Sequence, residues 1–505
     1  MPAPIPRRQF FQTAATGALG ALGGLDFLAR LPRVTAAEAR LETRFVQFRP
    51  EIEPLVRLLE ETPRERLLEE VGRRIQRGLS YREVLSALLL AGVRNVQPRP
   101  VGFKFHAVLV VNSAHLASLA SPETDRWLPI FWALDYFKDS QARNAREGNW
   151  HLGPVEETTV PSADKAKAAF VKAMEAWDVA GADAAVVGLA RSAPPGEVFE
   201  TFCRFGARDF REIGHKAIYV ANSWRTLQHI GWQHAEPVLR SLAYALLDYN
   251  GENPAGRAAP EDRSFKRNRE LAAKIRNDWL TGKLDAAATT ELLQILRAGS
   301  ENDACDQVVA LLNRGCSPQP IWDALFASAG ELLMRDPGII SLHAVTSTNA
   351  FHFAFQTSKD DTTRRLLLLQ NAAFVPLFRS ASNAKKSALR IDEFEPFQTK
   401  SSGADAIGEI FATVSHDKLG AARRTLAYLK ENPDAKALLD TARRLIFLKG
   451  DNPHDYKFSA AVLEDYGHVS TAVRAHFLVA SMFYLHGSAD KENDLVKRTR
   501  GALAV

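Results

Sequence analysis

The chain has 505 residues, of which 46% are hydrophobic and 24% are charged, and its formal net charge is +5. This much apolar sequence can bury a large core, and beyond the N-terminal segment no apolar run is long enough to cross a bilayer, so no stable membrane span is expected. The positive charge is small and dispersed along the chain, which argues against nucleic acid as a partner.

The first residues resemble a twin-arginine export signal. Arg7 and Arg8 precede an apolar run rich in alanine and glycine, which ends in Ala37-Glu38-Ala39, a cleavage site of the A-x-A type. An ordinary N-terminal helix or a membrane anchor is the alternative, but the run is too short to span a bilayer. We therefore expect the twin-arginine translocase to export the folded protein to the periplasm or the extracellular space, with residues 1–39 removed as its signal peptide.

The remainder of the chain is predicted to be helical, because apolar residues recur at helical spacing and alternating strand patterns are scarce. This pattern indicates an all-α fold, built as a single large helical domain. The clearest expected helices are 63–71, 81–91, 209–230, 237–247 and 421–429.

Histidines recur at two fixed spacings. His106 and His343 are 237 residues apart, as are His115 and His352, whereas His215 and His454 are 239 apart, as are His229 and His468. The flanking sequence agrees, since the Arg-Gly-x-Ser segment at 77–80 recurs at 314–317. This spacing predicts an internal duplication, with two large halves related by a pseudo-twofold axis.

The turn-rich sequence of residues 250–256 marks the boundary between the halves. We expect a first helical half at 45–250, a linker at 251–265, and a second helical half at 266–486. The C-terminal tail, 487–505, is charged and then small and apolar, and is expected to be a solvated helix or a frayed end.

Helix geometry limits which histidines can share one ion. His106 and His115, nine residues apart, would point about 180° apart and lie ~13 Å apart along a helix axis. His215 and His229 would share a face but lie ~21 Å apart. One member of each pair is therefore a ligand candidate. The local matches and the surroundings of His454 favour the set His106, His215, His343 and His454.

Lys457 lies three residues after His454, so on a helix the two side chains share one face. An ammonium group has only donors and cannot bind a cation, but a lysine that has added carbon dioxide becomes an anionic carbamate and can act as a carboxylate ligand. The equivalent position in the first half is Ile218, so this lysine would break the symmetry once. Alternatively, Lys457 is a surface lysine paired with Asp455 or Glu464.

The histidines also have a simpler interpretation, because a lone histidine on an apolar helix is more often a hydrogen-bonded core residue than a ligand. Retention of the same residue at equivalent positions weakens this alternative. The other four histidines of the repeat, His115, His229, His352 and His468, are expected to pack or to support the ligands. Asn112 and Asn349 are candidates for orienting them.

Three segments resemble the questin oxidase-like family: residues 342–346 (Leu-His-Ala-Val-Thr), His454-x-x-Lys457, and His215 with the following helical stretch to Tyr244. The resemblance covers roughly 60 to 485, and its motifs are short. It implies a largely helical fold and oxidative cleavage of polyketide anthraquinones. It also implies a mononuclear non-haem iron held by four histidines and a carboxylated lysine, which here would be His106, His215, His343, His454 and Lys457.

We therefore expect an exported non-haem iron-dependent oxygenase that uses dioxygen and an aromatic or quinone-like substrate, and the resemblance implies a dioxygenase. His454 and Lys457 would carry the catalytic role. The alternative is an exported helical-repeat protein that binds a metal or a partner without catalysis. Hydrolase, Walker and dinucleotide-binding motifs are missing from the sequence. Three cysteines make no disulfide framework, and pairing of Cys305 with Cys316 stays open.

Overall fold

The computed structural model describes residues 45–397 and 401–504, and the regular secondary structure of these residues is helical, as the sequence predicts. Within these ranges β-type pairing is confined to one isolated bridge between Lys283 and Cys316. The fold class is therefore all-α. The predicted export signal and its cleavage site lie outside the described residues.

The first half of the described chain contains eleven α-helices. They are α2 (Glu53–Glu61), α3 (Arg64–Gln76), α4 (Tyr81–Asn95), α5 (His106–Leu109), α6 (Val111–Leu119), α7 (Leu128–Arg146), α8 (Ala163–Ala176), α9 (Val179–Ser192), α10 (Pro195–Gly206), α11 (His215–Ile230) and α12 (Ala235–Leu246). Helix α4 illustrates how the local sequence sets the start of a helix and which of its residues are buried. Ser80 and Glu83 close a capping box at its start, and nearly every later residue of the helix is buried.

The second half of the described chain contains twelve α-helices. They are α13 (Arg263–Ala272), α14 (Ala286–Ala298), α15 (Glu301–Asn313), α16 (Pro318–Arg335), α17 (Ile339–Thr357), α18 (Asp361–Ala381), α19 (Gly403–Val414), α20 (Lys418–Glu431), α21 (Lys436–Lys449), α22 (Pro453–Asp465), α23 (Thr471–Ser481) and α24 (Asp494–Ala504). The expected linker, 251–265, is shorter in the structure, because α13 already begins at Arg263.

Helix boundaries recur at the spacing set by the histidines. Both ends of α3 and α15 are 237 residues apart, and both ends of α9 and α20 are 239 apart. The packing also recurs, since α8 packs on α9 as α19 packs on α20, and α2 packs on α4 as α14 packs on α16. The origin of the two halves by duplication stays a prediction.

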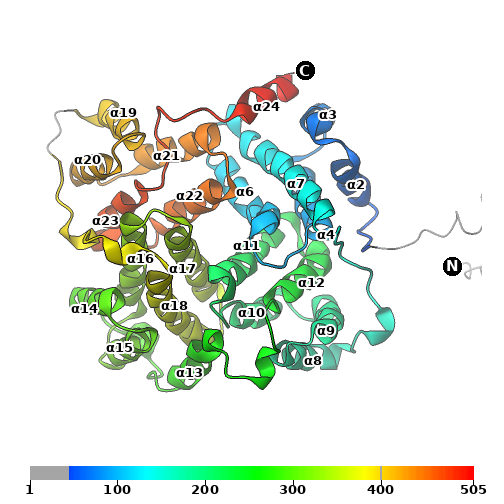
Figure 1. Ribbon diagram of the computed structural model, residues 1–505, viewed down its shortest axis with the longest axis horizontal. Helices are drawn as coiled ribbons and strands as arrows, with labels where there is room; N and C mark the ends of the chain where they lie inside the picture. Colours follow the sequence, from blue (N-terminus) through cyan, green and yellow to red (C-terminus); the bar gives the residue numbers. More distant parts are fainter. Residues whose placement is uncertain (1–44, 398–400, 505) are drawn as a thin grey trace, which may run out of the picture. The chain divides into compact units, whose positions relative to one another are not determined.

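Four helices from the two halves meet at the centre of residues 45–505. Helix α6 packs against both α11 and α22, and α17 packs against the same two helices (Figure 1). Most residues of α11 and α17 are buried, including polar ones such as Asn222 and Thr348. A histidine lies at or near the start of each of α5, α11, α17 and α22, so this arrangement brings the beginnings of helices from both halves together.

Each half is completed by one more helix. Helix α24 packs on α3 and α7, and α13 packs on the equivalent helices α15 and α18. Gly72 permits this close approach, because a Cβ atom there would lie 2.2 Å from the carbonyl oxygen of Ala502. Arg498 adds an ion pair with Glu69, at 2.9 Å. The tail, which was expected to be a solvated helix or a frayed end, therefore contains a helix that packs on the first half.

The expected helix at 209–230 begins later than predicted. Residues 211–214 form a 3₁₀ turn in which Glu212 and Ile213 have positive φ angles of 57° and 44°, and Gly214 has a φ of 82°. This left-handed stretch interrupts the helical hydrogen bonding, so α11 starts at His215. The shift places His215 in the first turn of its helix.

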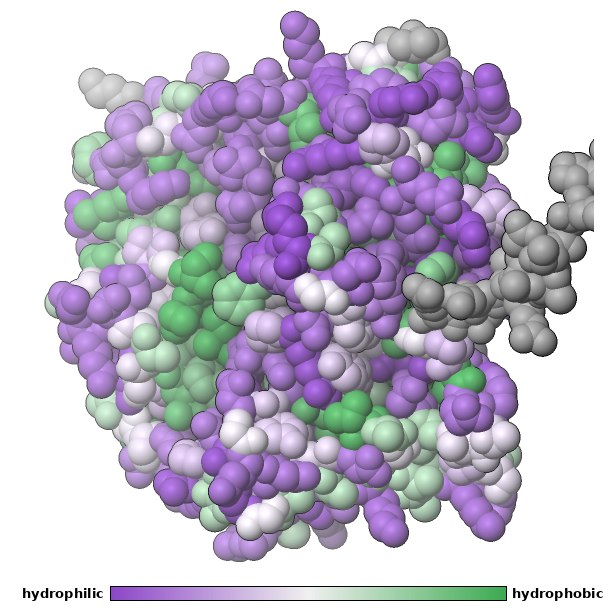
Figure 2. Space-filling view, turned by 45° about the vertical axis from the view of Figure 1, so that its right-hand side comes forward, coloured by the Kyte–Doolittle hydropathy of each residue, from purple (hydrophilic) through white to green (hydrophobic). Residues whose placement is uncertain are grey.

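The surface of the described residues is mostly hydrophilic on the face drawn in Figure 2, where apolar residues gather in separate patches. Helices with one apolar stripe give this distribution, because the stripe faces the core. Among the described residues, no helix combines the length and the apolar character that crossing a membrane requires.

Candidate metal centre

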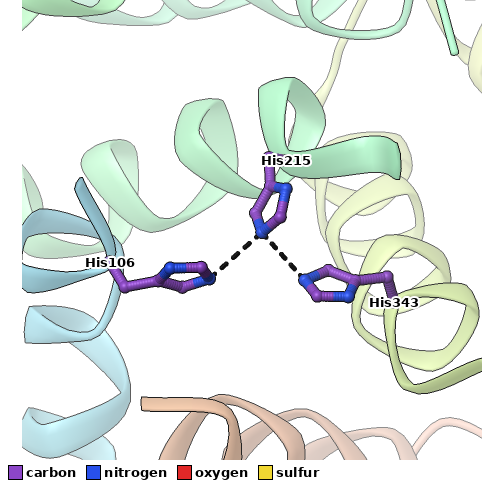
Figure 3. Close-up of side chains that lie close together, drawn as sticks. All are labelled: His106, His215 and His343. Atoms are coloured by element: carbon purple, nitrogen blue, oxygen red, sulfur yellow. Dashed lines mark hydrogen bonds between the residues drawn. The ribbon is translucent and has the colours of Figure 1, made fainter. Parts of the chain in front are cut away.

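Three of the predicted ligands converge in the core. His106, His215 and His343 project from α5, α11 and α17 toward one point (Figure 3). All three are buried, and each offers a ring nitrogen within 4.8 Å of those of the other two. The Nε2 atom of His215 lies 3.1 Å from that of His106 and 2.8 Å from that of His343.

The other nitrogen of each ring is held by a backbone carbonyl. Nδ1 of His106 lies 2.8 Å from the oxygen of Phe103, Nδ1 of His215 lies 2.7 Å from that of Glu212, and Nδ1 of His343 lies 2.7 Å from that of Ile339. A carbonyl only accepts, so each Nδ1 carries the donated proton, and the hydrogen-bond pattern assigns the tautomer.

The three Nε2 atoms therefore carry lone pairs that face one another. A second proton on any ring is disfavoured, because burial and the nearby Lys457 lower the pKa of all three imidazoles well below its usual value. Three facing lone pairs repel one another unless a cation lies between them. Donation from Nδ1 to a carbonyl is also the usual support for a histidine that binds a metal through Nε2.

His454 lies against the same cluster. It follows Pro453 in the first turn of α22, where Asn452 and Asp455 form a capping box. Its ring centroid is 4.6 Å from that of His106 and 5.3 Å from that of His343. Burial and Lys457 lower the pKa of His454 to about 3. The closely spaced set of ligand atoms comprises the other three histidines, and His454 borders it.

The four rings form a closed circuit with repeating geometry. The ring centroids of His106 and His215 are 5.0 Å apart, with an angle of 80° between the ring planes. The equivalent pair, His343 and His454, has centroids 5.3 Å apart and an angle of 82°. The other two neighbouring pairs are 4.3 Å apart at 60° and 4.6 Å apart at 61°. Residues at equivalent positions in the two halves therefore have nearly the same surroundings at this site.

Lys457 is buried beside the four histidines. Its side chain is 3% exposed, and its Nζ atom has no hydrogen-bond partner among the described residues. Burial lowers the pKa of this amine to about 7. The alternative of a surface lysine paired with Asp455 or Glu464 was therefore wrong. Glu464 pairs instead with Arg225, at 2.6 Å.

A small cavity lies next to Lys457, with a volume of about 10 Å³. Its walls include five pairs of equivalent residues, namely Asn112 with Asn349, Ser113 with Ala350, Ile218 with Lys457, Asn222 with Ala461, and Arg225 with Glu464. The last pair is joined by the ion pair described above, and Asn349 donates to both Glu464 and Asp465 at 2.8 Å. Equivalent residues that meet in this way place the cavity between the two halves.

The predicted orienting role of Asn112 and Asn349 was wrong, because backbone carbonyls hold the three buried ligands and Asn349 binds acidic side chains instead. The remaining repeated histidines form two pairs of their own. His115 and His229 have ring centroids 4.1 Å apart, and the equivalent His352 and His468 are 4.9 Å apart.

Sequence reasoning missed the residues that hold the ligands. Phe103 has a φ of 46°, and the glycine before it, Gly102, has a φ of 139° and would place a Cβ atom 3.1 Å from the ring of His215. Left-handed residues thus precede both His106 and His215, and such strained positions cluster at functional sites. A glycine shortly before each of these histidines was the available signal.

The cysteines take no part in the centre. Cys203, Cys305 and Cys316 are buried free thiols, so the structure does not contain the possible bridge between Cys305 and Cys316.

Comparison with known proteins adds nothing to this geometry. No protein-family model, curated protein or solved structure matches the chain. Its function is therefore argued from the buried histidines and the lysine alone.

Proposed function

We propose that the protein binds one transition-metal ion through His106, His215, His343 and His454. The observation that carries this proposal is the set of buried, neutral imidazoles whose Nδ1 atoms are engaged and whose Nε2 atoms face one another. Neutral imidazoles are common ligands of iron, copper, nickel and zinc. A purely structural histidine cluster would instead donate a proton from one ring to the next.

Lys457 fits this centre only after a chemical change. An ammonium group beside a cation is repelled, and a buried amine without a partner makes no use of its hydrogen-bonding capacity. As a carbamate, Lys457 would supply a carboxylate-like anion to a set of four neutral ligands. The surrounding cavity, lined by Asn112 and Asn222, offers amide groups that can bind the carbamate oxygens.

We further propose that the metal is iron and that the protein is an exported oxygenase acting on an aromatic or quinone-like compound. A bound iron ion would supply electrons to dioxygen, which is the chemistry that an oxygenase requires. The protein's own part is to hold four neutral ligands and one anion in fixed directions and to exclude bulk water. Membership of the questin oxidase-like family stays a prediction.

Metal analysis tests the first part of this proposal. The full chain, loaded with iron under anaerobic conditions and freed of excess metal, should retain about one ion per chain, in keeping with a single four-histidine centre. His343→Ala should lose it, whereas His115→Ala should retain it because His115 belongs to a separate pair. Equal metal content in all three proteins would show that the cluster is structural.

Oxygen uptake tests the second part. The iron-loaded protein is mixed with a panel of hydroxylated aromatics and quinones, and oxygen consumption is followed with an electrode. We expect uptake that depends on one class of compound and that is lost in His454→Ala and Lys457→Ala. Stoichiometric metal without uptake on any compound would favour the alternative, an exported metal- or partner-binding helical protein without catalysis.

A further inference from the structure

The small cavity at Lys457 adjoins a second and larger one. The outer cavity has a volume of about 200 Å³ and lies among α6, α21 and α22. The two cavities share three wall residues, Leu116, Ala460 and Glu464. These residues separate the outer space from the inner one, where Lys457 lines the wall.

The outer cavity is open to solvent at one side and apolar further in. Arg443 and Glu464 stand on its wall with side chains that are 30% exposed. Most of the remaining wall is apolar, with Phe447 and Leu463 deeper inside. The inner cavity has room for one water-sized molecule. Such a passage favours a small uncharged molecule, because an ion would have to shed its water in apolar surroundings.

The place lined by the equivalent residues of the two halves is filled. Leu116 corresponds to Phe353 and Leu463 corresponds to Trp224, at the spacings set by the histidines. Trp224 stacks on Phe199 at 4.4 Å, and Phe353 lies 6.2 Å from Phe199 and 3.9 Å from the guanidinium of Arg225. Aromatic rings thus occupy this side, whereas leucines leave space on the side that leads to the lysine.

We propose that this passage admits carbon dioxide to Lys457. The inference rests on the proposed function, in which Lys457 becomes a carbamate. The passage ends at an unpartnered amine, which is a nucleophile toward carbon dioxide and is inert toward dioxygen. Leu116 and Ala460 lie on the wall that the two cavities share, so the width of the passage depends on the size of these two side chains.

The reaction at the end of the passage is balanced without an oxidant or a reductant. The lone pair of Nζ forms a bond to the carbon atom, one C=O π bond breaks, and its electron pair becomes the carboxylate charge. The amine then loses one proton. This proton leaves to solvent through the outer cavity.

The rate of carbamate formation tests the passage. The full chain, freed of metal and carbon dioxide, receives ¹³C-labelled bicarbonate with carbonic anhydrase, and the carbamate signal is followed by ¹³C NMR. Ala460→Leu should slow its appearance by about tenfold or more, with the same final extent. Adding Leu116→Ala to that variant should restore the rate, because the smaller side chain at position 116 reopens the space that the larger one at position 460 fills.

The matched control is Ala472→Leu, the same change in a cavity that does not adjoin Lys457. It should leave the rate unchanged. An unaltered rate in Ala460→Leu would overturn the passage but leave the lysine ligand intact, as would an effect confined to the oxygen dependence of turnover. A wild-type protein that forms no carbamate, with or without metal, would instead refute the carboxylated lysine of the proposed function.

Discussion

Replacing Lys457 by methionine should have opposite effects on stability in the absence and the presence of metal. Without metal or carbon dioxide, the amine is buried without a partner, and its pKa falls from 10.5 to about 7. Each pKa unit corresponds to about 1.4 kcal/mol, so keeping this lysine buried at neutral pH costs about 5 kcal/mol as an upper bound. Methionine has a similar length and no charge, so Lys457→Met should raise the free energy of unfolding by up to that amount.

The stability that Lys457→Met gains over the wild-type protein should decrease as the pH rises. Above pH 10.5 the amine is neutral in both the folded and the unfolded chain, so the cost vanishes. As the pH falls from 10.5 to about 7, the unfolded chain binds a proton that the folded chain does not, and the cost grows. Urea unfolding of the metal-free protein in carbon dioxide-free buffer, between about pH 6 and 9, should therefore show an advantage for Lys457→Met that shrinks with rising pH.

Loading with metal and bicarbonate should make Lys457→Met less stable than the wild-type protein, because methionine cannot become an anionic ligand. Ile218→Met is the matched control, since Ile218 is the equivalent residue on the wall of the same cavity. It should change the free energy of unfolding by less than about 1.5 kcal/mol. A metal-free Lys457→Met protein that is less stable than wild type at every pH would refute the reasoning, since the amine would then have a favourable partner.

Three further outcomes are expected. The metal should be released as the pH falls from about 7 to 5, measured as metal content after gel filtration, because below a pKa of about 7 the amine of Lys457 is protonated, cannot remain a carbamate and repels the ion, although His454 has a pKa of about 3. Gly214→Ala should lower the free energy of unfolding by about 1–3 kcal/mol, and by more than Gly251→Ala, because both glycines have a positive φ but only at Gly214 would the Cβ atom meet a side chain, that of Ser347. Changing Arg7 and Arg8 to lysine should retain the protein in the cytoplasm on cell fractionation, and undiminished export would show that the motif is accidental.

The sequence predicted the histidine cluster because its members recur at fixed spacing. Two intervals, 237 and 239 residues, pair eight histidines; helix geometry limits the candidates to one of each pair, and the local matches and the surroundings of His454 then favour four of them. The structure brings three of these four into one cluster and places the fourth ring beside it. Spacing works here because the equivalent histidines of the two halves meet in one cluster of rings.

Contacts that depend on the path of the backbone could not be predicted in this way. The carbonyls that hold the histidines come from Phe103, Glu212 and Ile339. Every residue has a backbone carbonyl, so the sequence does not show which of them accepts a hydrogen bond. The ion pair between Arg225 and Glu464 was within reach, since the two are 239 residues apart. Because the two residues have opposite charges, a search for repeats, which compares residue types, does not match them.

The position of α24 has a consequence for folding. The apolar face of α3 near Gly72 is covered by residues 494–504, which are synthesised only after helices α4 to α23. A chain from which α24 has been removed, or to which it has not yet been added, therefore keeps that face of α3 exposed, and chaperones that bind exposed apolar surface can distinguish it from a chain in which α24 is docked.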